Sequence, residues 1–137
     1  MKGQLPIIAA IGRIVIAALF LMSGLGKLGA PVATQGYIAT VGLPFPLLGY
    51  AVAILAEVGC GFLLLIGYRT SIVAALLAVF TLATAVFFHN NFADQNQMIH
   101  FLKNIMIVGG LLQVVAFGAP ALSLDARRAG ARLALAR

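Results

Sequence analysis

The chain has 137 residues, about the size of one domain, of which 63% are hydrophobic and only 9% are charged. Lys and Arg number 9 against 3 Asp and Glu, yet basic patches interleaved with aromatic residues are missing, so no nucleic-acid partner is expected. The single cysteine, Cys60, excludes a disulfide, a CxxC redox pair and a cysteine zinc site within this chain. Four long apolar stretches instead predict an integral membrane protein, with the lipid bilayer as its partner.

The first apolar stretch, residues 5–28, is long enough to cross a bilayer as a helix. Pro6 suits the first helical turn, and the segment 29–31 ends the helix. We expect a retained transmembrane helix rather than a cleaved signal peptide, because the run has the length of a span, Arg13 interrupts it and no Ala-x-Ala site follows. Residues 32–43 are mixed in polarity and too short to cross, so they are expected to form a short interfacial segment.

The other three spans are predicted at residues 46–66, 71–89 and 98–117, each with the roughly 17–25 residues that a crossing helix needs. Residues 67–70 form a tight connector, so the second and third spans are expected to make an antiparallel hairpin. Residues 90–97 are the longest polar stretch and are predicted to be a loop between the third and fourth spans.

The tail, residues 121–137, differs in composition from the rest. Ser123 is a candidate helix cap, and the arginines that follow alternate with Leu133 and Leu135. This pattern predicts a basic amphipathic segment on an anionic membrane surface, with a solvated, partly frayed tail as the alternative. The chain is therefore divided into a four-span bundle, residues 1–120, and a basic tail.

Basic residues collect on one side of the predicted membrane, where four spans also place both ends of the chain. They are Lys2, Arg69, Arg127, Arg128, Arg132 and Arg137. The positive-inside rule therefore predicts a multi-pass protein of a bacterial-type inner membrane, with both termini in the cytoplasm.

Each span carries one stripe of small and polar residues at helical spacing, while its other faces are mostly large and aliphatic. Small residues allow membrane helices to approach closely, so the stripes are expected to face one another in an all-α, antiparallel, up-down four-helix bundle. The stripes are Arg13, Ala17, Phe20, Gly24 and Lys27; Tyr50, Ala53, Glu57 and Gly61; Ser71, Ala75, Ala78, Ala85 and His89; and Lys103, Met106, Gly110 and Gln113.

Two of these polar residues, Arg13 and Glu57, lie at similar predicted depths. They are about 12 Å and about 15 Å from the cytoplasmic ends of their spans, at about 1.5 Å per residue. An ionisable residue within a span is expensive unless it has a partner, a water-filled cavity or a ligand. We therefore expect a structural ion pair between Arg13 and Glu57 that docks two helices, with a proton-linked or ligand-linked role as the alternative.

A second polar layer, nearer the outside, contains Lys27, His89, Lys103 and Asn104. These cations and the amide are the predicted ligand-binding residues, in an outward-facing cationic pocket that suits a quinone head group or a small anion. The alternatives are lysines that only extend to the interface and an interfacial histidine. His89 could also relay protons, because its ordinary pKa lies near neutrality. No haem, iron–sulfur or metal site is predicted, because His89 and His100 are the only candidate histidine ligands and His100 has few carboxylates near it.

Several short motifs follow one another in a fairly specific order and spacing along the chain. They are Arg13 with residues 20–28 (FLMSGLGKL); Gly42-Leu43-Pro44; Glu57 with Gly59 and Gly61; Gly67-Tyr68-Arg69; Phe88-His89; Lys103-Asn104 with Gly109-Gly110; Gly118; and Ser123-Leu124-Asp125. In these features the chain resembles the DoxX family of small four-helix membrane proteins, from about residue 13 to residue 125. Cys60, where a small residue such as glycine is expected, and the segment 90–97 depart from the pattern.

The resemblance implies a four-helix membrane fold. It also implies that some relatives are the membrane subunit of a thiosulfate:quinone oxidoreductase, that others take part in membrane-associated responses to oxidative stress, and that many have no assigned activity. The leading hypothesis is therefore a quinone-linked redox component. If the protein is an enzyme, this hypothesis makes it the membrane subunit of a quinone-dependent oxidoreductase. The alternative is a non-enzymatic accessory subunit that packs against a larger membrane complex. A carrier or channel is disfavoured because inverted repeats and discontinuous helices are missing.

Overall fold

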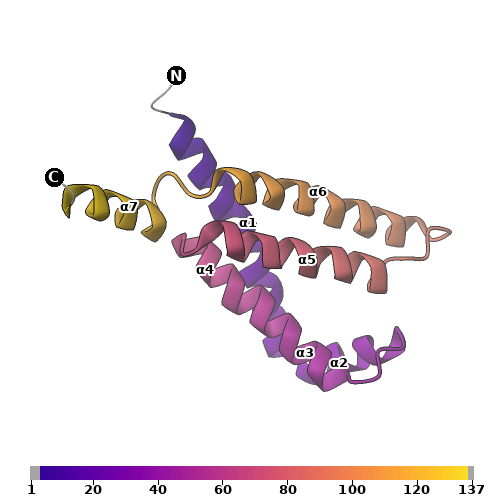
Figure 1. Cartoon of the computed structure of the whole chain (residues 1–137). Helices are drawn as coiled ribbons and strands as arrows, with labels where there is room; N and C mark the ends of the chain where they lie inside the picture. The colour runs from indigo at the N-terminus through magenta and orange to yellow at the C-terminus, as the bar shows by residue number, and fades with distance from the viewer. Residues whose placement is uncertain (1–3, 136–137) are drawn as a thin grey trace.

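The computed structural model describes residues 4–135 and is all-helical, with no strand among those residues (Figure 1). The elements are α1 (Leu5–Gly29), α2 (Pro31–Thr40), α3 (Pro46–Ile54), the π-helix η1 (Leu55–Cys60), α4 (Gly61–Ile66), α5 (Thr70–Phe88), α6 (Gln95–Phe117) and α7 (Leu124–Leu135). Four helices are long and apolar enough to cross a membrane: α1, the continuous unit α3–η1–α4 over Pro46–Ile66, α5 and α6. The predicted all-α membrane fold with four spans is therefore confirmed.

The helices begin and end where local chemistry requires. A proline stands in the first turn of α1, α2 and α3, where its missing N–H costs no hydrogen bond. Gly67 ends α4 with φ +68°, the left-handed conformation that glycine adopts easily. The Asp94 side chain accepts hydrogen bonds from the N–H groups of Asn96 and Gln97, so α6 begins at residue 95, three residues before the prediction.

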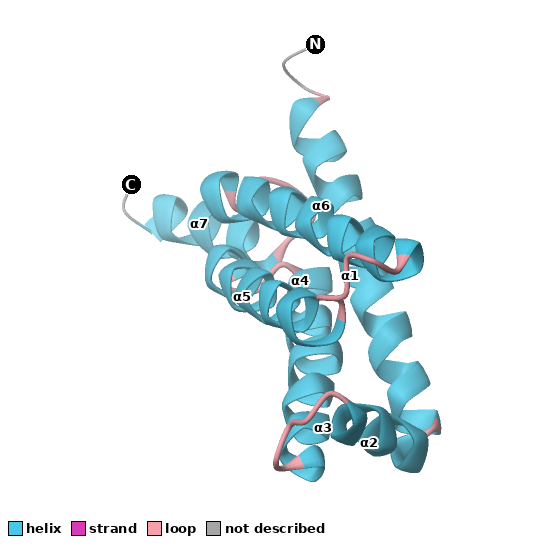
Figure 2. Ribbon diagram, turned by 90° about the vertical axis from the view of Figure 1, so that its right-hand side faces the viewer, coloured by secondary structure: helices cyan, strands magenta, loops and turns pink. Residues whose placement is uncertain are grey.

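The spans are arranged as two pairs that cross one another, not as four helices along one axis. α5 and α6 lie side by side as a hairpin, while α1 packs against η1 and α4 (Figure 1). The pairs meet near the connector between α4 and α5 and diverge away from it, as both views show (Figure 2). The segment predicted to be interfacial forms the helix α2, which joins α1 to α3 at the divergent end.

The apolar core lies where the two pairs meet. Its buried members come from α1, α4, α5 and α6: Ala17, Phe20, Leu64, Val73, Ala74, Leu77, Ala78, Leu111 and Val114. The outer faces of all four spans expose large aliphatic side chains such as Leu19, Leu55, Leu76 and Met106. In water such surfaces would aggregate, but hydrocarbon accommodates them, so the burial pattern is that of a bilayer protein.

The small and polar stripes face the interior in α1 and in the second span, but the prediction for α6 is wrong. Lys103, Met106 and Gln113 are exposed, and Met106 is 69% exposed. The inward face of α6 instead contains Leu111 and Val114, which are buried. The error is a rotation of one residue, which is about 100° on a helix and moves the whole stripe to a neighbouring face.

Candidate functional site

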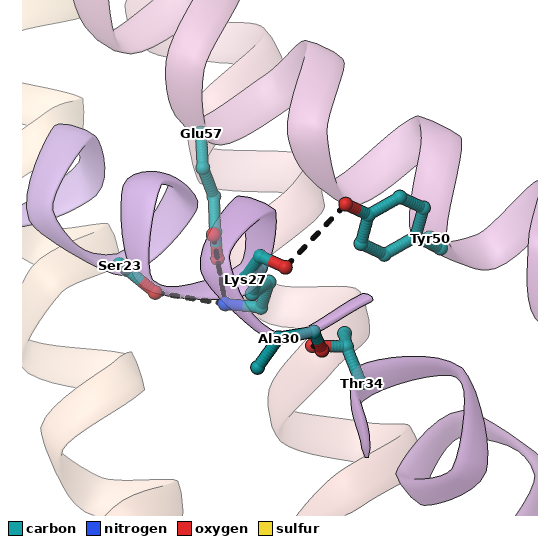
Figure 3. A network of polar contacts seen from close by, with 6 residues as sticks. All are labelled: Ser23, Lys27, Ala30, Thr34, Tyr50 and Glu57. Atoms are coloured by element: carbon teal, nitrogen blue, oxygen red, sulfur yellow. Dashed lines mark hydrogen bonds and ion pairs between the residues drawn. The ribbon is translucent and has the colours of Figure 1, made fainter. Parts of the chain in front are cut away.

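Glu57 is the acidic residue at the centre of the membrane-spanning part, and its partner is Lys27. The Lys27 Nζ lies 2.7 Å from the Glu57 Oε2 and 2.9 Å from its Oε1, and it also donates to the Ser23 hydroxyl at 2.8 Å (Figure 3). The Glu57 side chain is 8% exposed and that of Lys27 is 30% exposed. A carboxylate in such surroundings is stable only when it is paired and hydrogen-bonded, and Lys27 provides both.

The local backbone explains how Glu57 reaches this position. Glu57 lies within η1, and π-helical turns inside α-helices are rare and frequently occur at functional sites. On the facing helix, Gly24 lets α1 approach closely: a Cβ atom there would lie 2.6 Å from the Val58 Cγ2 and 3.0 Å from the Glu57 Cβ. The π-helical turn and the glycine together set the distance across which Lys27 reaches Glu57.

The predicted ion pair between Arg13 and Glu57 is not formed. The Arg13 Nη1 donates to the carbonyl oxygens of Leu64 and Leu65, and its Nη2 donates to that of Leu122 at 2.7 Å. The carbonyls in the last turn of α4 lack the full set of helix partners, and the Leu64 carbonyl accepts one backbone hydrogen bond, from the Gly67 N–H at 3.2 Å, so a buried guanidinium there completes their hydrogen bonding. Leu64 follows Glu57 by seven residues, about 10 Å along a helix, which places the two charges at different levels.

Asp125 joins the connector between α4 and α5 to α7, at the same end of the molecule as Arg13. The Asp125 carboxylate accepts hydrogen bonds from the Arg69 N–H at 2.9 Å, the Thr70 N–H at 2.8 Å and the Thr70 hydroxyl at 2.7 Å. It thereby caps the first turn of α5, whose N–H groups otherwise lack partners. Sequence reasoning gave Asp125 no role, and its position after the Ser123 cap was the only available signal.

The surroundings of Asp125 also change its acidity. Burial raises the pKa of this carboxyl, but the hydrogen bonds from Thr70 and Arg69 and the charge of Arg128 outweigh it and leave the pKa below its ordinary value. Arg128 in addition lies over the Tyr68 ring, 4.7 Å from the ring centroid. We call this set of contacts, made by Tyr68, Arg69 and Thr70 with Asp125 and Arg128, the tail lock. It joins α7 to the connector between α4 and α5.

A cavity of about 380 Å³ lies between the two diverging helix pairs, within the range of about 300–1,000 Å³ that is usual for small-molecule sites. Its walls are largely aromatic and aliphatic, with rings from Tyr37, Phe80, Phe87 and Phe88. Polar side chains converge on it from several helices: Ser23, Lys27, Thr34, Glu57, Thr84, His89 and Asn104. An apolar cavity with a few polar groups is what a flat organic ligand with polar edges requires.

Three of the four predicted ligand-binding residues, Lys27, His89 and Asn104, line this cavity. Lys103 does not line it and is exposed, because α6 turns Asn104 inward instead. Since Lys27 is paired with Glu57, the cavity is also not the cationic pocket that the sequence predicted.

His89 and Asn104 have hydrogen-bonding capacity left for a ligand. The His89 Nδ1 lies 3.0 Å from the Gln97 Oε1, and its ring stacks on that of His100 at 5.1 Å between centroids. Among residues 4–135, no hydrogen bond engages the His89 Nε2 or the Asn104 side chain. In the same part of the chain, no group of three or more His, Cys, Asp or Glu residues is arranged to hold a metal ion.

Comparison with known proteins places the chain in a family. The model of the DoxX family matches residues 8–90. The chain is 38% identical over 115 residues to the inner membrane protein YqjF of Escherichia coli strain K12, covering 84% of this chain and 87% of that protein. It is 34% identical over 127 residues to the inner membrane protein YphA of the same organism, covering 89% and 91%. No solved structure matches significantly. The chain therefore belongs to the DoxX family.

Proposed function

We propose that this protein is a quinone-linked redox component that binds a quinone head group in the cavity between the helix pairs. The observation that supports this most directly is the combination of aromatic walls with hydrogen-bonding side chains inside a four-span membrane protein. A quinone ring presents two flat apolar faces and two carbonyl oxygens at opposite edges. It therefore needs apolar walls and a small number of hydrogen-bond donors, and this cavity has both.

We assign the Asn104 amide N–H as the donor to a quinone carbonyl. The His89 Nε2, which is the acceptor nitrogen of the ring when Nδ1–H donates to the Gln97 Oε1, is assigned as the acceptor for a quinol hydroxyl. Both side chains line the cavity, and neither atom is engaged by another residue in the described range 4–135. The three protons of the Lys27 ammonium are already directed at Glu57 and Ser23. Lys27 and Glu57 then act as a polar floor of the site.

The charge balance favours a quinone over the small anion considered from the sequence. A free anion would need uncompensated positive charge, but Lys27 is neutralised by Glu57 at 2.7 Å and Lys103 lies outside the cavity. A neutral ligand meets no such requirement, because hydrogen bonds with uncharged side chains such as Asn104 suffice.

The test is a binding titration of the purified protein in lipid nanodiscs with 2,3-dimethoxy-5-methyl-1,4-benzoquinone and with its quinol. Removing one hydrogen bond is expected to weaken binding by about tenfold, so Asn104→Leu should raise the Kd of the quinone, and His89→Ala that of the quinol, by about this factor. Lys103→Met is the matched control on the same helix and should bind like the wild type. Wild-type affinity for both forms in Asn104→Leu combined with His89→Ala would overturn the proposed site.

The alternative, an accessory subunit without its own ligand, makes the opposite prediction. The exposed aliphatic faces of the four spans would then pack against a larger membrane complex. Co-purification of a stoichiometric complex whose activity survives Asn104→Leu and His89→Ala would favour this role over quinone binding.

We also infer that the chain lies in a bacterial inner membrane with both termini in the cytoplasm, as the positive-inside rule requires. Both relatives named above are inner membrane proteins. Four arginines among the described residues lie on the side of the tail lock. Arg69 is in the connector between α4 and α5, and α7 carries Arg127, Arg128 and Arg132. Lys2 and Arg137 lie outside the described residues. A fluorescent protein that folds only in the cytoplasm, fused to the C-terminus, should be bright; a dark fusion with an active periplasmic reporter would contradict this.

A further inference from the structure

A second cavity, of about 150 Å³, lies next to Glu57 and is lined by residues of α1, α5 and α6. Five residues line both cavities: Ser23, Glu57, Phe80, Thr84 and Asn104. The larger cavity and the smaller one therefore adjoin, with a shared wall made by Glu57 and the four residues named with it. We call the smaller one the α1–α6 slot.

The slot is apolar away from that shared wall. Its remaining lining is Ile16, Leu19, Phe20, Thr81 and Ile107. Leu19 is 55% exposed on the outer face of α1, which a bilayer would cover with hydrocarbon. The slot therefore leads from the polar floor of the site toward lipid.

Helix packing closes the slot at one end. The Ile16 Cδ1 lies 3.3 Å from the position that a Cβ atom on Gly110 would occupy, so α1 and α6 are in close contact there. Phe20, next along the inward face of α1, is buried. Beyond these contacts the helix pairs diverge toward α2 (Figure 2). A chain in the slot would leave sideways between α1 and α6 and not along the helix axes.

We propose that the α1–α6 slot holds the hydrocarbon chain of a membrane quinone whose head group occupies the larger cavity. This proposal rests on the function proposed above and names the ligand class: a lipid-soluble quinone with a long chain, not a water-soluble one. Lipid and protein interior are similarly apolar, so the chain gains little affinity by entering the slot. The role of the slot is steric, because it lets the head group reach Asn104 while the chain remains in apolar surroundings.

The experiment compares two probes that share one head group, 2,3-dimethoxy-5-methyl-1,4-benzoquinone and the same quinone with a decyl chain. Ile107→Trp fills the slot, and Ile105→Trp is the matched control on α6, since Ile105 lines neither cavity. A second pair of variants keeps the test decisive if Ile107→Trp fails to fold. Leu19→Trp changes the exposed mouth of the slot, and Leu25→Trp is its control on α1, where Leu25 is 58% exposed.

The slot variants should weaken binding of the decyl quinone by about tenfold, the size expected when an oversized side chain enters occupied space. Their affinity for the quinone without a chain should be unchanged, and both controls should match the wild type with both probes. Unchanged binding of the decyl quinone in Ile107→Trp and Leu19→Trp, or equal loss for both probes, would overturn the slot while leaving the head-group site intact. Failure of the wild type to bind either probe would instead overturn the proposed function and the slot with it.

Discussion

Lys27 and Glu57, thirty residues apart in the sequence, form the ion pair that joins the end of the first span to the middle of the second, with 2.7 Å between the Lys27 Nζ and the Glu57 Oε2. Both residues line the larger cavity, and Glu57 also lines the smaller one, so the pair is at once a helix contact and part of the wall of the candidate site. The pair holds α1 and η1 in register beside that site.

Removing either member of this pair should destabilise the protein unequally. Lys27→Met leaves a carboxylate that is 8% exposed without its partner, whereas Glu57→Gln leaves a lysine that can turn toward solvent or the interface. We expect a loss of about 2 kcal/mol in the free energy of unfolding for Lys27→Met, less than the roughly 3–5 kcal/mol of fully buried pairs because Lys27 is partly exposed. Glu57→Gln should lose less, and the double variant less than the sum. Additive losses in detergent unfolding would contradict a direct pair.

Gly24 should be intolerant of any side chain. A Cβ atom there would lie 2.6 Å from the Val58 Cγ2 and 3.2 Å from the Val58 backbone nitrogen, so α1 must move away from η1. Overpacking of this kind costs roughly 1–3 kcal/mol, and Gly24→Ala should show it as a lower midpoint of thermal unfolding.

The control for Gly24→Ala lies two residues along the same helix. A Cβ atom on Gly26 meets nothing within 4 Å, so Gly26→Ala should leave the stability unchanged or raise it slightly through better helix propensity. Equal destabilisation by the two substitutions would show that helix packing at Gly24 is not the cause.

Arg13 should act independently of Glu57. Arg13→Met leaves the carbonyls of Leu65 and Leu122 without the donor that Arg13 supplies, at about 1–3 kcal/mol for each buried group left unpaired, whereas the Leu64 carbonyl keeps the Gly67 N–H. Because Arg13 and Glu57 share no partner, Arg13→Met and Glu57→Gln should add within about 0.3–0.5 kcal/mol. A larger coupling energy in the double-variant cycle would restore the ion pair that the sequence suggested.

The tail lock should open at acidic pH. Because the pKa of Asp125 is lower in the folded protein than in the unfolded chain, its contribution to stability is present above its ordinary value of about 3.9 and is lost as the pH falls through the folded pKa. The protection factors of the α7 amides, which correct for the pH dependence of intrinsic exchange, should therefore fall in the wild type below about pH 4.

Asp125→Asn removes the charge of Asp125 while keeping nearly the same side-chain size and shape. Its neutral amide cannot titrate, so the α7 amides should have lower protection factors at neutral pH and show little further change in protection in acid. Asp94→Asn, which removes the carboxylate cap of α6 at the other end of the molecule, should leave exchange in α7 unchanged. An acid-induced opening that persists in Asp125→Asn would assign it to another group.

The four spans could be predicted from the sequence because apolar runs of this length leave the backbone one solution in lipid, a helix with internal hydrogen bonds. The inward stripe of α1 could also be predicted, since Arg13, Ala17, Phe20 and Gly24 recur at helical spacing and are all buried. The proline and glycine positions marked most helix ends for the same local reasons.

The partner of each charged residue could not be predicted, because helical phase says which residues share a face but not how far each helix turns or tilts. A rotation of one residue in α6 exchanges Asn104 for Lys103 in the cavity. The π-helical turn at Glu57 and the crossing of the two helix pairs likewise depend on contacts between distant segments, such as Gly24 with Val58. The sequence by itself thus determined which segments cross the membrane and which polar residues they carry. The tertiary structure decided that Glu57 meets Lys27, because packing sets the rotation and tilt on which every such contact depends.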